Sequence, residues 1–256
     1  MEVFVNEIAI WMDCFNQEQH FGHHVPFQAL KTPMLRNALL ACGGLRMSLG
    51  EPDHRQTASM YYNTATSQLL RNLQNPERNT AECATAAVVL NTYEAMTHQP
   101  AHRMSHVAGA RALIKECGWN AASSGVGAAC FWLNVGTEVL DCLATNVPTT
   151  WDPNDWGVDM EFSGDQNSNE ACSDGGIWVH RMFYIVANVA NFRATSPPYE
   201  GMSPHAAQME RSSRFGEWQR IKRLCDKWND GCPRSMHPLG YLDHSDRTDS
   251  CFPKIW

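Results

Sequence analysis

Three histidines spaced four residues apart form the pattern in this sequence closest to a metal site. His98, His102 and His106 would share one face of a helix, and histidines at i and i+4 can bind one zinc ion together. However, Pro100 disturbs the helix between them, and no glutamate follows His102 as it does in zinc proteases. We therefore interpret these histidines as surface or capping residues and predict no metal site.

A second histidine group lies in the sequence EQHFGHHVP. His20, His23 and His24, together with Asp13 or Glu18, are the residue types of an acid–base or metal site. The turn residues among them favour the alternative, an exposed loop.

The ten cysteines lack the pattern of a zinc finger, ribbon or cluster. Such sites need closely paired cysteines, and Cys-x-x-Cys occurs nowhere in the sequence. Cys225 and Cys232 are separated by six residues but have no partner cysteines around them. Most of the cysteines lie among alanine, valine and leucine, which is typical of reduced, buried thiols in an intracellular protein. Disulfides are the alternative.

Two carboxylates, Glu138 and Asp141, lie in a largely apolar helical stretch. They are candidates for a buried acid pair, but we expect them to line a polar edge or to pair with an arginine such as Arg181. The sequence has no nucleophile elbow, no glycine-rich phosphate loop and no dinucleotide fingerprint. We therefore predict no catalytic residues and no cofactor.

An aromatic group is the candidate ligand site. If the loop over 147–162 folds over the helix predicted at 125–146, these rings would wall an apolar pocket, and a plain hydrophobic core is the alternative. The group consists of Phe131, Trp132, Trp151, Trp156 and Trp178.

The elements that position these residues are predicted to be helical almost throughout, because apolar residues recur at helical spacing. The predicted fold class is an all-α, irregular multi-helix bundle in one domain over 1–256, incomplete at its C-terminal end. Residues 163–176 have the composition of a mobile loop, and the tail 232–256 has no clear period. The predicted helices cover 3–15, 31–50, 55–73, 80–97, 101–119, 125–146, 178–193 and 209–231.

Individual residues predict where helices begin and end. Thr32 and Pro33 favour a helix start, and Thr80 with Cys83 forms an imperfect capping arrangement. Gly118 stands where a left-handed cap would end a helix. The glycines of GVGAAC at 125–130 are interpreted as close packing or a cap.

The charge balance argues against unaided DNA binding. The chain has 20 basic and 27 acidic residues, a formal net charge of −7, whereas a domain that grips DNA by itself usually carries a basic face. The first residues do not read as a signal peptide, and no run of about 18 apolar residues predicts a membrane span. We expect a soluble, intracellular protein without membrane contact.

The order and spacing of many segments resemble one family. VNEIAIWMDCFNQEQHFGHHVP, AACFWLNVGTEVLDCL, WDPNDWGVDM and WVHRMFYIVANVANF are similar to the fungal-specific transcription factor domain, the regulatory region of fungal zinc-cluster activators. The resemblance extends over nearly the whole chain. It implies an all-α bundle in the nucleus that controls transcription, in some members by binding a lipophilic small molecule. The six-cysteine cluster of the family is missing, and family helices normally continue beyond the segment FPKIW, so we expect a truncated chain.

Three functional hypotheses follow. The first is a regulatory domain that acts through ligand or protein contacts, with the transcriptional machinery, a DNA-binding partner protein or a second copy of itself as partner, and without contacting nucleic acid. The second is a biosynthetic enzyme or small-molecule-binding protein on the same bundle, with Glu138, Asp141 and His180 as acid–base groups. The third is a non-functional fragment with exposed apolar surface at Ile255 and Trp256.

Overall fold

The computed structural model describes residues 1–97, 100–162, 175–196, 201–238, 240–242 and 254–255, with the backbone alone at 100–106, 241–242 and 254–255. Most of the predicted mobile loop, residues 163–174, lies outside these ranges, and Gly175 and Gly176 already belong to a helix.

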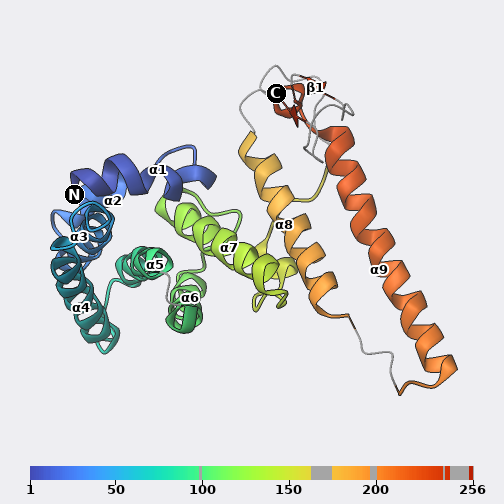
Figure 1. Cartoon of the computed structure of the whole chain (residues 1–256), viewed down its shortest axis with the longest axis horizontal. Coiled ribbons are helices and arrows are strands. Elements are labelled where there is room, and N and C mark those ends of the chain that lie inside the picture. The colour runs from blue at the N-terminus through green and yellow to red at the C-terminus, as the bar shows by residue number, and fades with distance from the viewer. Residues whose placement is uncertain (98–99, 163–174, 197–200, 239, 243–253, 256) are drawn as a thin grey trace. The chain divides into compact units, whose positions relative to one another are not determined.

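The described residues are mostly helical, which confirms the predicted all-α class (Figure 1). The only strands described are two residues long and pair antiparallel, Tyr241 with Ile255 and Leu242 with Lys254. The elements are η1 (Phe4–Ile8), α1 (Ala9–Met12), η2 (Asp13–Phe15), α2 (His24–Ala29), α3 (Pro33–Met47), α4 (His54–Leu73), α5 (Thr80–Met96), α6 (Pro100–Glu116), α7 (Gly125–Thr145), η3 (Pro153–Trp156), α8 (Gly175–Ala194), α9 (Pro204–Gly231), η4 (Arg234–Met236), β1 (Tyr241–Leu242) and β2 (Lys254–Ile255).

The chain forms two compact units. The first unit comprises residues 1–158 and 186–198, and the second comprises residues 159–185 and 199–256. Helix α8 contributes residues to both units, because the division falls between Ile185 and Val186. That the whole of 1–256 is one domain stays a prediction.

Helix α5 is the centre of the first unit. Every residue from Cys83 to Glu94 is buried, since α3, α4, α6 and α7 all pack against this helix. The apolar character on all sides that the sequence shows is typical of such a helix. Among the described residues, α7 is the one helix long and apolar enough to cross a membrane, and 67% of that stretch is buried, as in a core helix.

The helix boundaries follow local signals, but the predicted cap of α5 is wrong. Thr32 precedes α3 in extended conformation and Pro33 is its first residue, as predicted, although the Thr32 hydroxyl makes no capping bond. Gly118 has φ +69°, which confirms the left-handed position after α6. The cap of α5 is Asn79, whose side chain accepts from the Glu82 amide at 3.2 Å, rather than Thr80.

Two stretches predicted as loops contain helical residues. Pro26 lies in the first turn of α2, where a proline costs no hydrogen bond, so it does not break the chain there. Helix α9 begins at Pro204 rather than at 209, because the Ser203 hydroxyl accepts from the Ala206 amide and caps it.

Close packing requires glycine at two positions of α7. A Cβ at Gly127 would lie 2.7 Å from Trp119 Nε1, and a Cβ at Gly136 would lie 2.7 Å from Phe15 Cε2. The prediction that glycine in GVGAAC serves close packing is confirmed at Gly127.

The second unit is held together by contacts between α8 and α9. The Trp228 indole donates to the Trp178 carbonyl at 2.8 Å, and the two rings meet edge to face at 6.2 Å. Ile221 is the only buried residue of α9. The apolar residues at helical spacing on α9 are therefore buried only in part, and Trp218 remains 46% exposed. They are Trp218, Ile221, Cys225 and Trp228.

Candidate functional site

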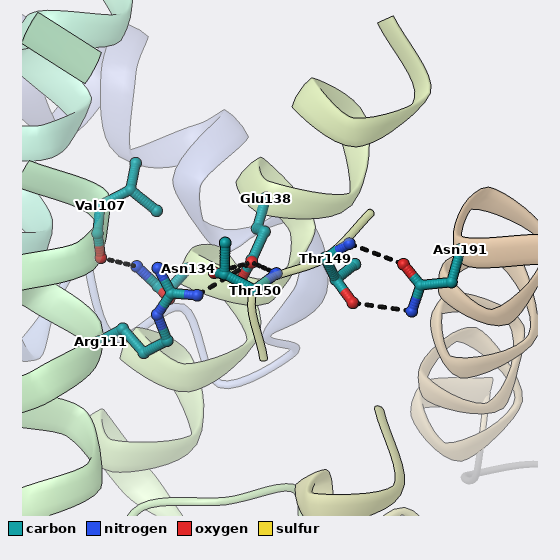
Figure 2. Close-up of polar contacts among 7 residues, drawn as sticks. All are labelled: Val107, Arg111, Asn134, Glu138, Thr149, Thr150 and Asn191. Carbon is teal, nitrogen blue, oxygen red and sulfur yellow. Dashed lines mark hydrogen bonds and ion pairs between the residues drawn. The ribbon is translucent and has the colours of Figure 1, made fainter. Parts of the chain in front are cut away.

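A buried polar network surrounds Glu138 (Figure 2). Glu138 Oε1 accepts from Arg111 Nη1 at 2.9 Å, from the Thr150 amide at 2.7 Å and from the Thr150 hydroxyl at 2.6 Å. The side chains of Arg111 and Glu138 are only 11% and 7% exposed. One carboxylate oxygen thus joins α6, α7 and the segment after α7.

The network continues from Thr150 to helix α8. The Thr149 amide donates to Asn191 Oδ1 at 2.6 Å, and Asn191 Nδ2 donates to the Thr149 hydroxyl at 2.8 Å (Figure 2). Two residues further along α8, Arg193 donates to the Asn146 side chain at 2.7 Å and to the Leu143 carbonyl at 2.6 Å. These bonds fasten the end of α7 and the segment that follows it to the part of α8 that belongs to the first unit.

Asn146 ends α7 in a conformation that few side chains adopt. Its φ is +56° and ψ is +41°, the left-handed region, which asparagine tolerates better than most residues. The turn that it makes lets the chain double back from α7, and its side chain then accepts from Arg193. The left-handed turn at Asn146 therefore directs the chain so that Thr149 and Thr150 reach their partners.

The ion pair of Glu138 differs from the one expected. We predicted an arginine such as Arg181, but the partner is Arg111 on α6. Arg181 lies in the second unit, where it donates to the carbonyls of Asp159 and Glu161 at 2.8 and 2.7 Å and lies over the rings of Phe162 and Trp178.

This geometry gives Glu138 a structural role. Three donors, one of them a guanidinium, bind the same oxygen of Glu138, and these bonds hold Arg111 and Thr150 in place. The negative charges of Glu138 and Asp141, added to the larger effect of burial, raise the pKa of the Cys142 thiol to about 11. His180, the third residue of the enzyme hypothesis, lies in the second unit. Catalysis by these three residues stays a prediction.

Four of the five predicted pocket residues are buried in the first unit. Phe131, Trp132, Trp151 and Trp156 are between 0% and 3% exposed. The Phe131 ring meets Trp132 edge to face at 5.0 Å and Trp151 at 5.3 Å, so the structure brings these three together. The ammonium of Lys115 lies 4.7 Å from the centre of the Trp151 ring.

The fifth residue, Trp178, lies in the second unit beside Phe162 and Trp228. The cavities described among the placed residues have other linings. One of about 320 Å³ is lined by η1, α1, η2 and the loop before α2, one of about 440 Å³ lies between α3 and α4, and one of about 20 Å³ lies beside Trp11. Binding of an apolar small molecule by the five aromatic residues stays a prediction.

The histidine-rich loop is organised by a buried carboxylate. Asp13 accepts from the backbone amides of Phe21 and Gly22 at 3.0 and 2.8 Å. His20 contacts Asn16 at 2.8 Å and Glu18 at 3.3 Å. Within the placed parts of the chain, no three histidine, cysteine or acidic side chains are grouped so that they could hold a metal ion. The pattern of His98, His102 and His106 lies outside the described side chains.

Sequence reasoning missed the residues that contact Glu138. Arg111 is 27 positions away on another helix, and the sequence contains nothing that pairs the two. Thr149 and Thr150 follow a helix end in a turn-rich segment, where threonine is common. The one available signal was Arg111 itself. It stands in the apolar half of the helix predicted at 101–119, and an arginine in such a position needs a buried partner.

Comparison with known families agrees with the resemblance. A family model described as "Fungal specific transcription factor domain" matches residues 1–192, which is 192 of the 256 residues. The match covers α1 to α7 and ends within α8, so the likeness expected for the tail lies beyond it. No curated protein and no solved structure matches the chain.

The matched region contains the polar network except Arg193, together with the buried aromatic residues, and it accounts for three quarters of the chain. The protein therefore belongs to the family of fungal-specific transcription factor domains.

Proposed function

We propose that this domain regulates transcription in the nucleus by contacting a basic, DNA-binding partner protein, rather than by reading DNA itself. A role in transcription follows from the family. The observation that carries the finer proposal is the net charge of −7. A chain of that charge is repelled by the phosphate backbone of DNA, whereas it complements the basic face of a DNA-binding protein.

Acidic residues and exposed apolar side chains occur together in the first thirty residues. Residues 1–30 contain four acidic residues, Glu2, Glu7, Asp13 and Glu18, and neither lysine nor arginine. Four large apolar side chains in the same stretch are exposed, and we call them the N-terminal surface: Ile10, Trp11, Phe27 and Leu30, with Ile10 68% and Phe27 63% exposed.

The N-terminal surface has the composition of a protein-binding patch. Ile10 and His23 line the cavity of about 320 Å³, and Phe27 lies one turn beyond His23 on α2. Aromatic and aliphatic anchors next to a hollow, with charge around them, are typical of the centre of a protein interface. Glu2 and Glu18 of the same stretch are exposed, which favours a basic partner and speeds its approach, whereas Glu7 pairs with Arg46 at 2.8 Å and Asp13 is buried.

A reporter assay tests the proposal. The full chain is fused to an unrelated DNA-binding module, and the output of a reporter carrying the cognate site is measured in a fungal host. We expect the fusion to change output several-fold relative to the module alone. The double variant Phe27→Ala, Leu30→Ala should remove most of that change. The matched control Met60→Ala, Leu70→Ala removes exposed apolar side chains from α4 and should preserve it.

A fusion that gives the same output as the module alone would contradict the regulatory function. Equal loss in the test and control variants would contradict the assignment of the N-terminal surface. A second copy of the chain as occupant would appear as concentration-dependent dimerisation in sedimentation, abolished by the test variant.

Direct DNA binding is measured separately. Fluorescence anisotropy with a labelled duplex of about 30 base pairs should show no binding tighter than about 100 µM at physiological salt, the weak end of the non-specific range. Tighter, salt-dependent binding would mean that the chain contacts DNA by itself.

A further inference from the structure

The cavity of about 320 Å³ beside the histidine-rich loop combines an apolar and a polar part. Val5 and Ile10 form the apolar part, whereas the polar part includes Asp13, Gln17 and Gln19. Ligand sites in proteins have volumes of about 300–1,000 Å³, so this cavity lies at the small end of the range. It therefore suits a single side chain or a ligand of similar size.

Backbone hydrogen bonds hold the loop that forms one wall of the cavity. Gln19 has φ +52°, a left-handed conformation that few side chains adopt, and its carbonyl accepts from the amides of Gly22 and His23 at 3.1 and 3.0 Å. The amides of Phe21 and Gly22 donate to the buried Asp13 carboxylate. Because this wall is already ordered, a ligand binds without the entropic cost of ordering it.

The Asp13 carboxylate has an acceptor position left for a ligand. It is 9% exposed, and Asp13 Oδ1 accepts from the Phe21 amide at 3.0 Å and from Asn16 Nδ2 at 3.4 Å. Asp13 Oδ2 accepts from the Gly22 amide at 2.8 Å, and the described residues supply it with no second donor. Since each carboxylate oxygen has about two acceptor positions, Oδ2 can take one more hydrogen bond.

The surroundings of the cavity favour a positively charged ligand. Among the described residues that line it, none is lysine or arginine. Glu18, whose side chain is 72% exposed, follows Gln17 and adds a second negative charge near the polar part. Ile10 belongs both to the cavity and to the N-terminal surface, so a protein that covers this surface can place a side chain in the cavity.

We propose that the cavity binds one arginine side chain of the basic partner, an inference that rests on the proposed function. The guanidinium would donate to Asp13 Oδ2 and to the amide oxygens of Gln17 and Gln19. The aliphatic part of the arginine would pack on Val5 and Ile10.

Arginine fits this lining better than the other candidate side chains. Its planar group presents five donors to several acceptors at once, whereas the ammonium of lysine presents three from a single point. A purely apolar side chain would cover the Asp13 carboxylate without supplying a donor, which is unfavourable for a buried polar group. The cavity would thus add a preference for arginine to the general attraction between the two charged proteins.

The test is an NMR titration of the isotope-labelled full chain with short synthetic peptides. The backbone amide of Gly22 reports on the cavity, because Gly22 lines it and donates to Asp13. The probe is a capped heptapeptide with a single arginine between leucine and serine residues. The comparison peptides carry lysine, norleucine or citrulline, the uncharged analogue of arginine, at the same position. We expect the arginine peptide to bind several-fold more tightly than the lysine peptide and about tenfold more tightly than the other two.

A change of charge at Gln17 gives a second test that leaves the bonds of Asp13 intact. Gln17 is exposed and lines the cavity. Gln17→Glu should strengthen and Gln17→Lys should weaken binding of the arginine peptide, each by about two- to fivefold, as expected for an exposed charge pair. The matched control is Gln56→Lys, at an exposed position of α4, which should leave the affinity unchanged.

Equal binding of the arginine and citrulline peptides would overturn the proposal, and equal binding of the lysine or the norleucine peptide would do the same. An identical response to Gln17→Lys and Gln56→Lys would also contradict it. Failure of the proposed function is recognised separately. If the wild-type fusion leaves reporter output unchanged while the arginine peptide binds, the regulatory function is wrong and the preference of the cavity for arginine stands.

Discussion

Among the described side chains, Arg111 supplies the one guanidinium that contacts Glu138, and its replacement by methionine leaves the carboxylate buried without it. Loss of one partner of a buried ion pair costs about 3–5 kcal/mol. Because Thr150 still donates its amide and hydroxyl to Glu138 Oε1, we expect the lower end, about 3 kcal/mol, for Arg111→Met. Glu138→Leu strands the guanidinium and both Thr150 donors, so we expect about 4 kcal/mol.

The double variant separates the ion pair from its surroundings. Arg111→Met with Glu138→Leu leaves no buried charge, so its cost should be about 4 kcal/mol rather than the sum of about 7, a coupling energy of about 3 kcal/mol. Urea denaturation of the full chain at pH 7, followed by tryptophan fluorescence, gives the four free energies of unfolding.

The matched control is the pair of Lys222 and Asp226 on α9, whose side chains are both 53% exposed and joined at 2.6 Å. An exposed pair at this spacing should show a coupling of only about 0.3–0.5 kcal/mol. If the buried pair of Arg111 and Glu138 gave a coupling no larger than this control, the structural role assigned to the network would be refuted.

Three further predictions concern stability. Gly127→Ala should lower the free energy of unfolding by about 1–3 kcal/mol, because the new Cβ would lie 2.7 Å from Trp119, and urea denaturation against Gly216→Ala, an open helical position, measures it. Asn79→Ala should cost about 1 kcal/mol through loss of the α5 cap, and an equal cost for a surface asparagine would argue against capping. Burial raises the pKa of Cys130 from 9.0 to about 12, so the stability that the buried neutral thiol contributes is complete below pH 9 and is lost between pH 9 and 12. At pH 10 the loss is about 1 kcal/mol, and Cys130→Val should remove that part of the pH dependence.

Local patterns made the helices predictable. The fold class depends on periodicity within single segments, and the start of α3 depends on two adjacent residues, Thr32 and Pro33. The start of α9 was missed although Ser203 and Pro204 carry the same kind of signal, because the turn formers just before them favoured a longer loop. The cap of α5 was placed one residue late, at Thr80, since threonine and asparagine compete for the same role.

The candidate site was predictable only in its individual residues. Glu138 was expected to line a polar edge or to pair with an arginine, but its pairing with Arg111 depends on the packing of α6 on α7, which no local pattern of the sequence encodes. The aromatic group shows the same limit: Phe131, Trp132 and Trp151 meet, whereas Trp178 lies in the other unit.

The enclosure of α5 constrains how members of this lineage can diverge. Twelve consecutive residues, from Cys83 to Glu94, have no side that faces solvent, so a larger or smaller side chain at almost any of them alters the packing of a neighbouring helix. Few single substitutions along this helix should therefore be neutral. A change there should be accompanied by a compensating substitution in α3, α4, α6 or α7. The surface helix α4, with two buried residues in its twenty, is free to diverge one residue at a time.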